Sequence, residues 1–407
     1  MTSRSLEEHR ADVVALLSPL APLNMSLSDA VGCVVVADYV APHSVPPLAL
    51  VAADGFAVRS ADTKGARMRP VTLAVTHDAL PGGSPTRVVP GAAVRVARGA
   101  ALPFGADAVV TRVEGTATSV LLDAEAVPGA GVVPVGHEIT AGDVVVAAGT
   151  RLSAGHVAAL AACGAASMTV RPAPRVVIIA VGSELQPHGA SRQQSVAVSE
   201  PVADATGPML SVLFSAAGAR VVRVTIVPDD APALRSAIDD ATLQADLVVT
   251  VGGLSTEWSD IVGPVLSHAF GVEVRMVRLS PGSRHGLGTV GPGDGRPVVL
   301  LALPGHPADA AAAFASYVAD AVAALRGVST ARVEAVAGEA WASPFGFAHV
   351  VAVVRREAED GVRVAPIGDP AAPTLRDLAA ADGLCLVPES TTAVRVGDTV
   401  DVLWWPR

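Results

Sequence analysis

Cysteine, aromatic residues and charged residues are all scarce in this sequence of 407 residues. The three cysteines, Cys33, Cys163 and Cys385, lie far apart among mostly apolar or small neighbours. This spacing excludes a disulfide framework and a cysteine-based zinc site, and it predicts buried thiols in a reducing cytoplasm. Aromatic residues make up 3% of the chain and charged residues 17%, so small aliphatic side chains must fill the cores.

An excess of positive charge is missing as well, because the net charge is −10. We therefore expect no binding to nucleic acid and none to anionic membranes. No uncharged apolar run approaches about 20 residues. The first 20 residues also lack the apolar core of a signal peptide. The sequence therefore predicts a soluble protein without membrane insertion.

The chain is too long for one hydrophobic core, since single cores stop growing at about 250 to 300 residues. Ser5 and Glu8 form a capping-box pattern, which predicts a short amphipathic helix at the N-terminus. Residues 60–150 contain short strand-like runs separated by glycine and proline, and strand patterns return after residue 330. These shifts predict a multidomain α/β protein with a β-rich module on each side of a central region.

The central region is organised around an apolar, β-branched run, 246–251, that ends in Gly252 and Gly253. Such a run is typical of a strand covered on both faces. Similar runs and helical patterns alternate around it, which predicts a doubly wound α/β domain with a parallel sheet. The expected strands are 176–180, 221–227, 246–251 and 298–303, and the expected helices are roughly 203–217, 231–243, 258–269 and 307–325.

Acidic residues follow three of these strands: Glu184, Asp229, Asp230 and Asp260. Ligands bind beyond the carboxyl ends of parallel strands, so we expect these carboxylates to meet at one edge of the sheet. Together they suit a hard cation such as Mg²⁺ beside a phosphorylated ligand. The alternative for each carboxylate alone is a helix N-cap or a solvated loop charge.

Gly252 and Gly253 also have two interpretations. Glycine allows a positive φ and lets backbone N–H groups approach an anion closely, which predicts a phosphate cradle. A strand that ends in two glycines is otherwise a tight turn.

Seven blocks of the sequence resemble one known family in their residues and in their order along the chain. They include Gly252-Gly253-Leu254-Ser255 and Leu303-Pro304-Gly305-His306-Pro307. The others are 46–47 with 53–59, 105–110, 142–144 with 148–152, 174–176 with 182–185, and 228–230. Through these blocks nearly the whole chain resembles the MoeA and gephyrin E-domain family, the molybdopterin molybdenumtransferases.

This resemblance implies a homodimer of four-part subunits. The implied parts are a discontinuous helical and linker domain (1–42 and 145–172), a β-rich insertion (43–144), a MogA-like α/β molybdopterin-binding domain (173–327) and a C-terminal β-barrel-like domain (328–407).

The resemblance also implies a reaction. Adenylylated molybdopterin and molybdate are the substrates, AMP is released, molybdenum stays on the dithiolene sulfurs, and Mg²⁺ is the cofactor. The implied catalytic residues are Asp54, Glu184, Asp229 and Asp260, of which the last three are also metal ligands. The implied ligand-binding residues are Gly252, Gly253, Ser255, Ser280, Ser283, Arg284, Pro304, Gly305 and Pro307.

The chain departs from the family at a loop that carries two lysines in Lys-Pro-Gly-Lys. That loop reads Ser280-Pro281-Gly282-Ser283 here, so both ammonium groups are absent. Arg98, Arg284 and His285 are the candidates to restore positive charge, since a guanidinium suits oxyanions. Two functions therefore stay open: a molybdenum-inserting enzyme with a rearranged anion site, or a catalytically weakened, gephyrin-like scaffold that binds a protein partner. A nucleotide-dependent enzyme unrelated to molybdenum is a third class.

Overall fold

The computed structural model of the protein describes residues 3–111, 113–187, 202–255, 260–291, 297–330, 332–358 and 361–406. The chain forms two compact units. Unit 1 comprises Met1–Leu23, Gly32–Val34 and Val170–Arg407, and unit 2 comprises Asn24–Val31 and Val35–Thr169. The chain passes between the units four times, within the short strands β1 (Leu23–Ser26), β2 (Val34–Val35) and β12 (Ser167–Arg171) and between Val31 and Gly32. The division of the chain into four domains, which the family resemblance implies, stays a prediction.

A six-stranded sheet forms the centre of unit 1. Its order is β16 (Arg220–Val227), β13 (Arg175–Val181), β17 (Leu247–Val251), β21 (Val298–Leu303), β20 (Arg284–Val290) and β18 (Glu273–Met276). The first four strands are parallel, which confirms the predicted doubly wound sheet. The two remaining strands were not predicted: β20 pairs antiparallel with β21, and β18 pairs antiparallel with β20.

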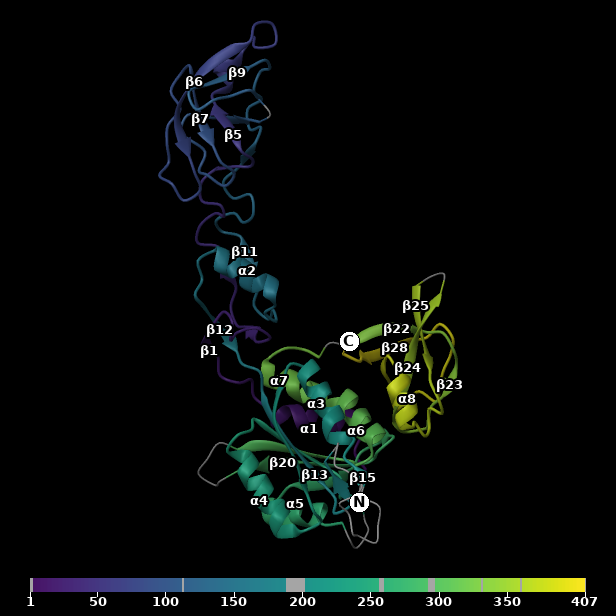
Figure 1. The fold of residues 1–407 in the computed structure, drawn as a ribbon. Coiled ribbons are helices and arrows are strands. Elements are labelled where there is room, and N and C mark those ends of the chain that lie inside the picture. Colours follow the sequence, from purple (N-terminus) through teal and green to yellow (C-terminus); the bar gives the residue numbers. More distant parts are fainter. Residues whose placement is uncertain are drawn as a thin grey trace, which may run out of the picture. The chain divides into compact units, whose positions relative to one another are not determined.

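Helices cover both faces of this sheet (Figure 1). One face carries α1 (Leu6–Ala15), α3 (Thr206–Ala216), α6 (Pro307–Ala313) and α7 (Ala319–Arg326), and the other carries α4 (Ala231–Thr242) and α5 (Val262–Phe270). Side chains of β13 alternate between the two cores, with Val176 and Ile178 in one and Val177 and Ile179 in the other. The expected start of α5 near residue 258 lies outside the described residues.

A π-helical turn, η3 (Phe314–Val318), joins α6 and α7 into one helix. By length and composition this helix could cross a membrane, but 89% of its most apolar window is buried inside the protein. We therefore assign it to the core. At the N-terminus, Ser5 and Glu8 form the predicted capping box of α1.

The chain after residue 332 forms a closed barrel. Its strands pair in the order β24 (Ala348–Ala358), β25 (Gly361–Pro366), β22 (Val333–Ala337), β28 (Thr399–Trp404) and β26 (Gly383–Val387), and β26 pairs with β24 again. The short strand β19 (Leu279–Ser280) adds to β24. This arrangement confirms the predicted C-terminal β-barrel-like domain. Four smaller strands and one helix complete unit 1: β14 (Leu185–Gln186), β15 (Val202–Ala203), β23 (Trp341–Ala342), β27 (Ala393–Val394) and α8 (Leu375–Ala380).

Unit 2 is rich in β-strands, as predicted. Its main sheet has the order β8 (Ala108–Val110), β5 (Gly55–Val58), β7 (Ala92–Val96), β6 (Val71–Ala79) and β9 (Ser119–Leu122). The remaining elements are β3 (Tyr39–Val40), β4 (Leu50–Val51), η1 (Ser60–Thr63), β10 (Val132–Val133), β11 (Val144–Val146) and α2 (Ala154–Ala162).

Candidate active site

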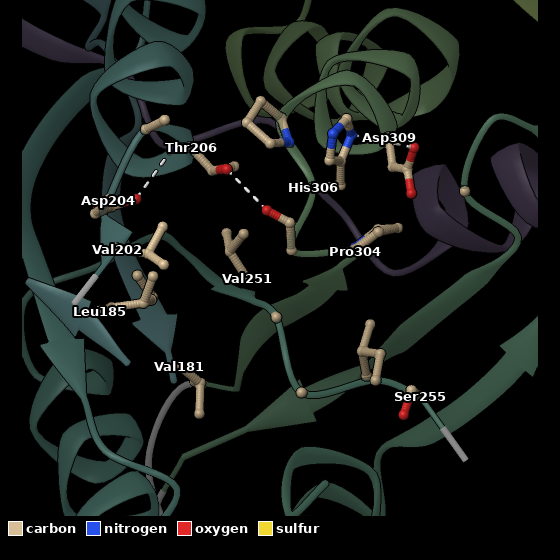
Figure 2. A pocket seen from close by; sticks show the side chains of 18 of the residues that line it. Val181, Leu185, Val202, Asp204, Thr206, Val251, Ser255, Pro304, His306 and Asp309 are labelled. Atoms are coloured by element: carbon tan, nitrogen blue, oxygen red, sulfur yellow. Dashed lines mark hydrogen bonds and ion pairs between the residues drawn. The ribbon is translucent and has the colours of Figure 1, made fainter. Parts of the chain in front are cut away.

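A cleft of about 810 Å³ opens at the carboxyl ends of β13, β17 and β21 (Figure 2). Its volume lies in the range of small-molecule sites. The chain leaves β13 toward β16 and returns to β17 on the other side of β13, so the cleft lies where the direction of winding reverses. The predicted residues that line it are Glu184, Gly252, Gly253, Ser255, Asp260, Ser283, Arg284, Pro304, Gly305 and Pro307.

The glycine loop after β17 has the backbone conformation that the sequence predicts. Gly252 and Gly253 have φ angles of 94° and 62°. A Cβ atom on Gly252 would lie 2.6 Å from the carbonyl oxygen of Val181, and one on Gly253 would lie 2.5 Å from a methyl group of Val262. Both positions therefore require glycine for conformation and for space.

The acidic residues divide into two groups. Glu184 and Asp260 line the cleft, and the carboxylate of Asp260 accepts a hydrogen bond from the backbone N–H of Ser255. Asp229 is not among the residues that line the cleft, and its carboxylate accepts a hydrogen bond from the backbone N–H of Ser183 at 2.8 Å. Asp230 is the N-cap of α4, as the alternative interpretation has it.

Two further carboxylates line the cleft that were not predicted from the sequence, Asp204 and Asp309. Asp204 accepts hydrogen bonds from the backbone N–H groups of Thr206 and Gly207 at 3.0 and 2.9 Å, in the first turn of α3, whose N-cap residue is Ala205. Asp309 lies in the first turn of α6, where its Oδ1 is 3.7 Å from Nδ1 of His306. Burial raises the pKa of Asp309, an effect that His306 partly offsets. The Asx-type position of Asp204 before a helix was the one signal available in the sequence.

Within the described part of the chain, no group of three or more His, Cys, Asp or Glu side chains is placed to hold a metal ion. Glu184 and Asp260 nevertheless offer carboxylate oxygens, the donor type that Mg²⁺ prefers. Mg²⁺ commonly takes one or two carboxylates and completes its shell with substrate phosphate and water. The residues present therefore fit a Mg²⁺ ion that arrives with a phosphorylated ligand.

Arg284 and His285, the two candidate cations that follow the loop Ser280-Pro281-Gly282-Ser283, lie in different surroundings. Arg284 lines the cleft, and no described residue makes a hydrogen bond or an ion pair with its guanidinium. His285 points the other way and is completely buried. Ser283 lines the cleft, whereas Ser280 lies in β19 opposite His349 of β24 and does not.

Asp54 belongs to unit 2 and is exposed at the start of β5. Its Oδ1 accepts a hydrogen bond from the backbone N–H of Arg98 at 2.7 Å. It lines a hollow of about 390 Å³ within unit 2, so its predicted catalytic role stays a prediction.

These features define a multidomain α/β protein with a cleft of small-molecule size at the carboxyl ends of a doubly wound sheet. Three family profiles match the chain: MoeA N-terminal region (domain I and II) over residues 4–164, probable molybdopterin binding domain over 177–324, and MoeA C-terminal region (domain IV) over 334–405. The chain belongs to the MoeA family of molybdopterin molybdenumtransferases.

Relatives and solved structures agree over the full length. Molybdopterin molybdenumtransferase 2 of Mycobacterium tuberculosis is 31% identical, over 98% of this chain and 99% of that protein. Molybdopterin molybdenumtransferase of Staphylococcus epidermidis is 27% identical, over 94% of this chain and 90% of that protein. The crystal structure of the molybdopterin biosynthesis MoeA protein from Pyrococcus horikosii superposes with a TM-score of 0.76 at 25% identity, covering 100% of both chains.

Proposed function

We propose that this protein is a molybdopterin molybdenumtransferase of molybdenum cofactor biosynthesis. It takes adenylylated molybdopterin and molybdate, cleaves the phosphoanhydride to release AMP, and leaves molybdenum bound to the two dithiolene sulfurs. The observation that carries this proposal is Arg284, a guanidinium in the cleft without a partner among the described residues. Arg284 is half-buried, and its Nε is buried without a hydrogen-bond partner among the described residues, so an anionic substrate in the cleft would supply that partner.

The glycine loop accounts for binding of the phosphorylated end of the substrate. Gly252 and Gly253 have positive φ, so the backbone itself can lie against phosphate oxygens. Glu184 and Asp260 are the residues that would hold Mg²⁺, and the bound ion would neutralise phosphate charge. Without such an ion these carboxylates would repel the substrate.

Arg284 and Ser283 account for binding of molybdate. A guanidinium presents parallel N–H donors that match two oxygens of a tetrahedral oxyanion, and a hydroxyl adds one more donor.

The scaffold alternative has less support, because the full-length relatives are named as molybdenumtransferases and the cleft retains its glycine loop. The proposal includes a homodimer in the cytoplasm. No protein partner other than a second copy is needed for it.

The test is molybdate-dependent release of AMP from adenylylated molybdopterin in the presence of Mg²⁺. In an Arg284→Ala protein we expect the KM for molybdate to rise roughly 10-fold or more, because a charge-assisted contact contributes about 1.5 to 3 kcal/mol. The matched control is Arg235→Ala, since the Arg235 side chain is 64% exposed and pairs with Asp239 along α4. The natural protein releasing no AMP, or Arg284→Ala leaving the KM unchanged, would contradict the proposal.

A further inference from the structure

Three fully buried side chains lie behind the loop that carries Arg284. His9 of α1, His285 of β20 and Tyr317 of the π-helical turn are each 0% exposed. The ring of His9 meets Tyr317 edge-on at 4.7 Å between centroids, and His285 meets Tyr317 edge-on at 5.5 Å. None of the three lines the cleft, so none of them touches a ligand bound there.

The hydrogen bonds of His285 define its tautomer. Its Nε2 lies 2.9 Å from the carbonyl oxygen of Gly282, which can only accept, so Nε2 carries the proton. Burial lowers the pKa of His285 to about 4, so the ring is neutral near pH 7 and Nδ1 is an acceptor. The hydroxyl of Tyr317, 2.9 Å from Nδ1, therefore donates to it.

Gly282 is held on its other side as well. It has φ of 74°, and a Cβ atom there would lie 2.6 Å from Cβ of Asp309 and 3.1 Å from the ring of Pro304. The loop therefore passes through a narrow space between the cleft wall and His285. Ser283 and Arg284 follow directly in the chain. The backbone conformation of Gly282 therefore determines from which point the Arg284 side chain extends into the cleft.

Tyr317 is itself fixed by its surroundings. The π-helical turn leaves backbone carbonyls without their usual helical partners. Arg332 donates hydrogen bonds to the carbonyls of Ala315 and Ser316 at 2.8 and 3.1 Å, next to Tyr317. A tyrosine held in this way is a rigid donor for His285.

We propose that His285 and Tyr317 are positioning residues, which hold the loop Gly282-Ser283-Arg284 in the conformation that binds the oxyanion substrate. This inference rests on the proposed function for the identity of the substrate. Packing alone does not account for the arrangement, because an apolar side chain would fill the same space without burying polar nitrogens. Both ring nitrogens of His9 lack a hydrogen-bond partner among the described residues, which is costly for stability. The cluster is therefore not arranged for stability alone.

Tyr317→Phe tests the first link, because it removes the hydroxyl and keeps the ring. The matched control is Tyr39→Phe, since Tyr39 is the other of the two tyrosines and lies in unit 2. In the ligand-free protein we expect amide hydrogen exchange of residues 282–284 to accelerate at least about 5-fold in Tyr317→Phe and to stay unchanged in Tyr39→Phe. In turnover, the KM for molybdate rises by a similar factor while kcat changes less than about 2-fold.

His285 variants test the second link. Gln places its amide nitrogen near the position of Nε2 and can still donate to Gly282, whereas Leu cannot. We expect exchange in His285→Gln within about 2-fold of the natural protein and an increase in His285→Leu of at least about 5-fold. Equal behaviour of Gln and Leu, or faster exchange spread over the whole α/β domain in Tyr317→Phe, would overturn the inference. Absence of molybdate-dependent AMP release from the natural protein would refute the proposed function instead, and the exchange of the ligand-free loop would still decide whether His285 and Tyr317 hold it.

Discussion

Among the described residues that line the cleft, one carries a permanent positive charge. Arg284 is the one arginine among the described residues that line the cleft, and the whole chain contains a single lysine, Lys64, in unit 2. A guanidinium is a planar fork with fixed donor directions, whereas an ammonium is a compact point charge on a flexible stem. Affinity for an oxyanion should therefore depend more strongly on loop geometry here than in a site with two lysines.

Gly253, the second glycine after β17, allows a test of the predicted phosphate cradle by a single substitution. Gly253→Val should lower the free energy of unfolding and also abolish ligand binding, because it combines a strained φ of 62° with a contact of 2.5 Å to Val262. The strain alone costs about 1 to 3 kcal/mol. Gly271→Val is the matched control, since Gly271 has φ of 66° at the end of α5 but nothing within 4 Å of the added Cβ.

Urea unfolding and calorimetry with molybdopterin, with and without Mg²⁺, measure the two effects separately. Gly271→Val should lose stability and retain binding. If Gly253→Val binds molybdopterin normally whenever it is folded, Gly252 and Gly253 form only a turn and not a phosphate cradle.

At the scale of elements, α1, β20 and the π-helical turn meet at buried histidines. Burial lowers the pKa of His9 to about 3 and that of His285 to about 4. Both values lie well below the ordinary histidine pKa of about 6.5, which applies to the unfolded chain. The elements therefore stay packed only while these rings remain neutral.

The sign of the pH dependence follows from proton binding. Between about pH 6 and pH 4.5 the unfolded chain binds protons on both histidines and the folded protein does not, so the free energy of unfolding falls as the pH falls. Two groups give a slope of about 2.7 kcal/mol per pH unit near pH 5. We expect His9→Phe to lower the measured slope by about 1.4 kcal/mol per pH unit, the contribution of one histidine.

Tryptophan fluorescence during urea unfolding measures this slope, because the four tryptophans, Trp258, Trp341, Trp404 and Trp405, all belong to unit 1 with both histidines. Burial raises the pKa of Asp309, so its contribution to the free energy of unfolding changes with pH in the opposite direction. This contribution is the same in His9→Phe and in the natural protein. A slope that is the same in His9→Phe and in the natural protein would show that His9 is already accessible to protons in the folded state.

Strands buried on both faces were the easiest elements to predict. β17 and β21 are buried at every position, so their sequences are continuous apolar runs. β20 was missed because it contains Gly286 and Gly288, where an added Cβ would lie 2.7 Å from Ala302 and 2.8 Å from Val272. Close packing against neighbours requires those glycines, and it cannot be read from local pattern.

The same limitation explains why the sequence did not place Asp204 and Asp309 in the cleft and did not separate Arg284 from His285. In a strand, successive side chains point to opposite faces, so Arg284 lines the cleft while His285 is buried. That distinction depends on knowing that a strand begins at residue 284. Asp204 and Asp309 reach the cleft through the packing of α3 and α6, and no spacing along the chain relates them to Glu184 or Asp260.

At the scale of the whole molecule, the cleft and Asp54 belong to different units. Every described residue that lines the cleft comes from unit 1, whereas Asp54 lies in unit 2. Symmetric dimers often build a site from two subunits, because a two-fold axis brings each contribution to both sites. The proposed homodimer would let the partner subunit's Asp54 serve the cleft of its neighbour.

Mixing two inactive variants tests this arrangement. Asp54→Asn and Glu184→Gln should each abolish AMP release as homodimers, because each removes a carboxylate from every site. In a mixed dimer the Asp54→Asn subunit keeps Glu184 in its own cleft and receives an intact Asp54 from its partner, so one of the two sites is complete. Random mixing of equal amounts should therefore restore about a quarter of the natural activity, since half of the dimers are mixed and each has one working site. Light scattering on the same samples checks that particles of twice 40.8 kDa are present. If dimers form and the mixture stays inactive, Asp54 acts within its own subunit or not at all; if only the monomer mass appears at micromolar concentration, the homodimer itself is wrong.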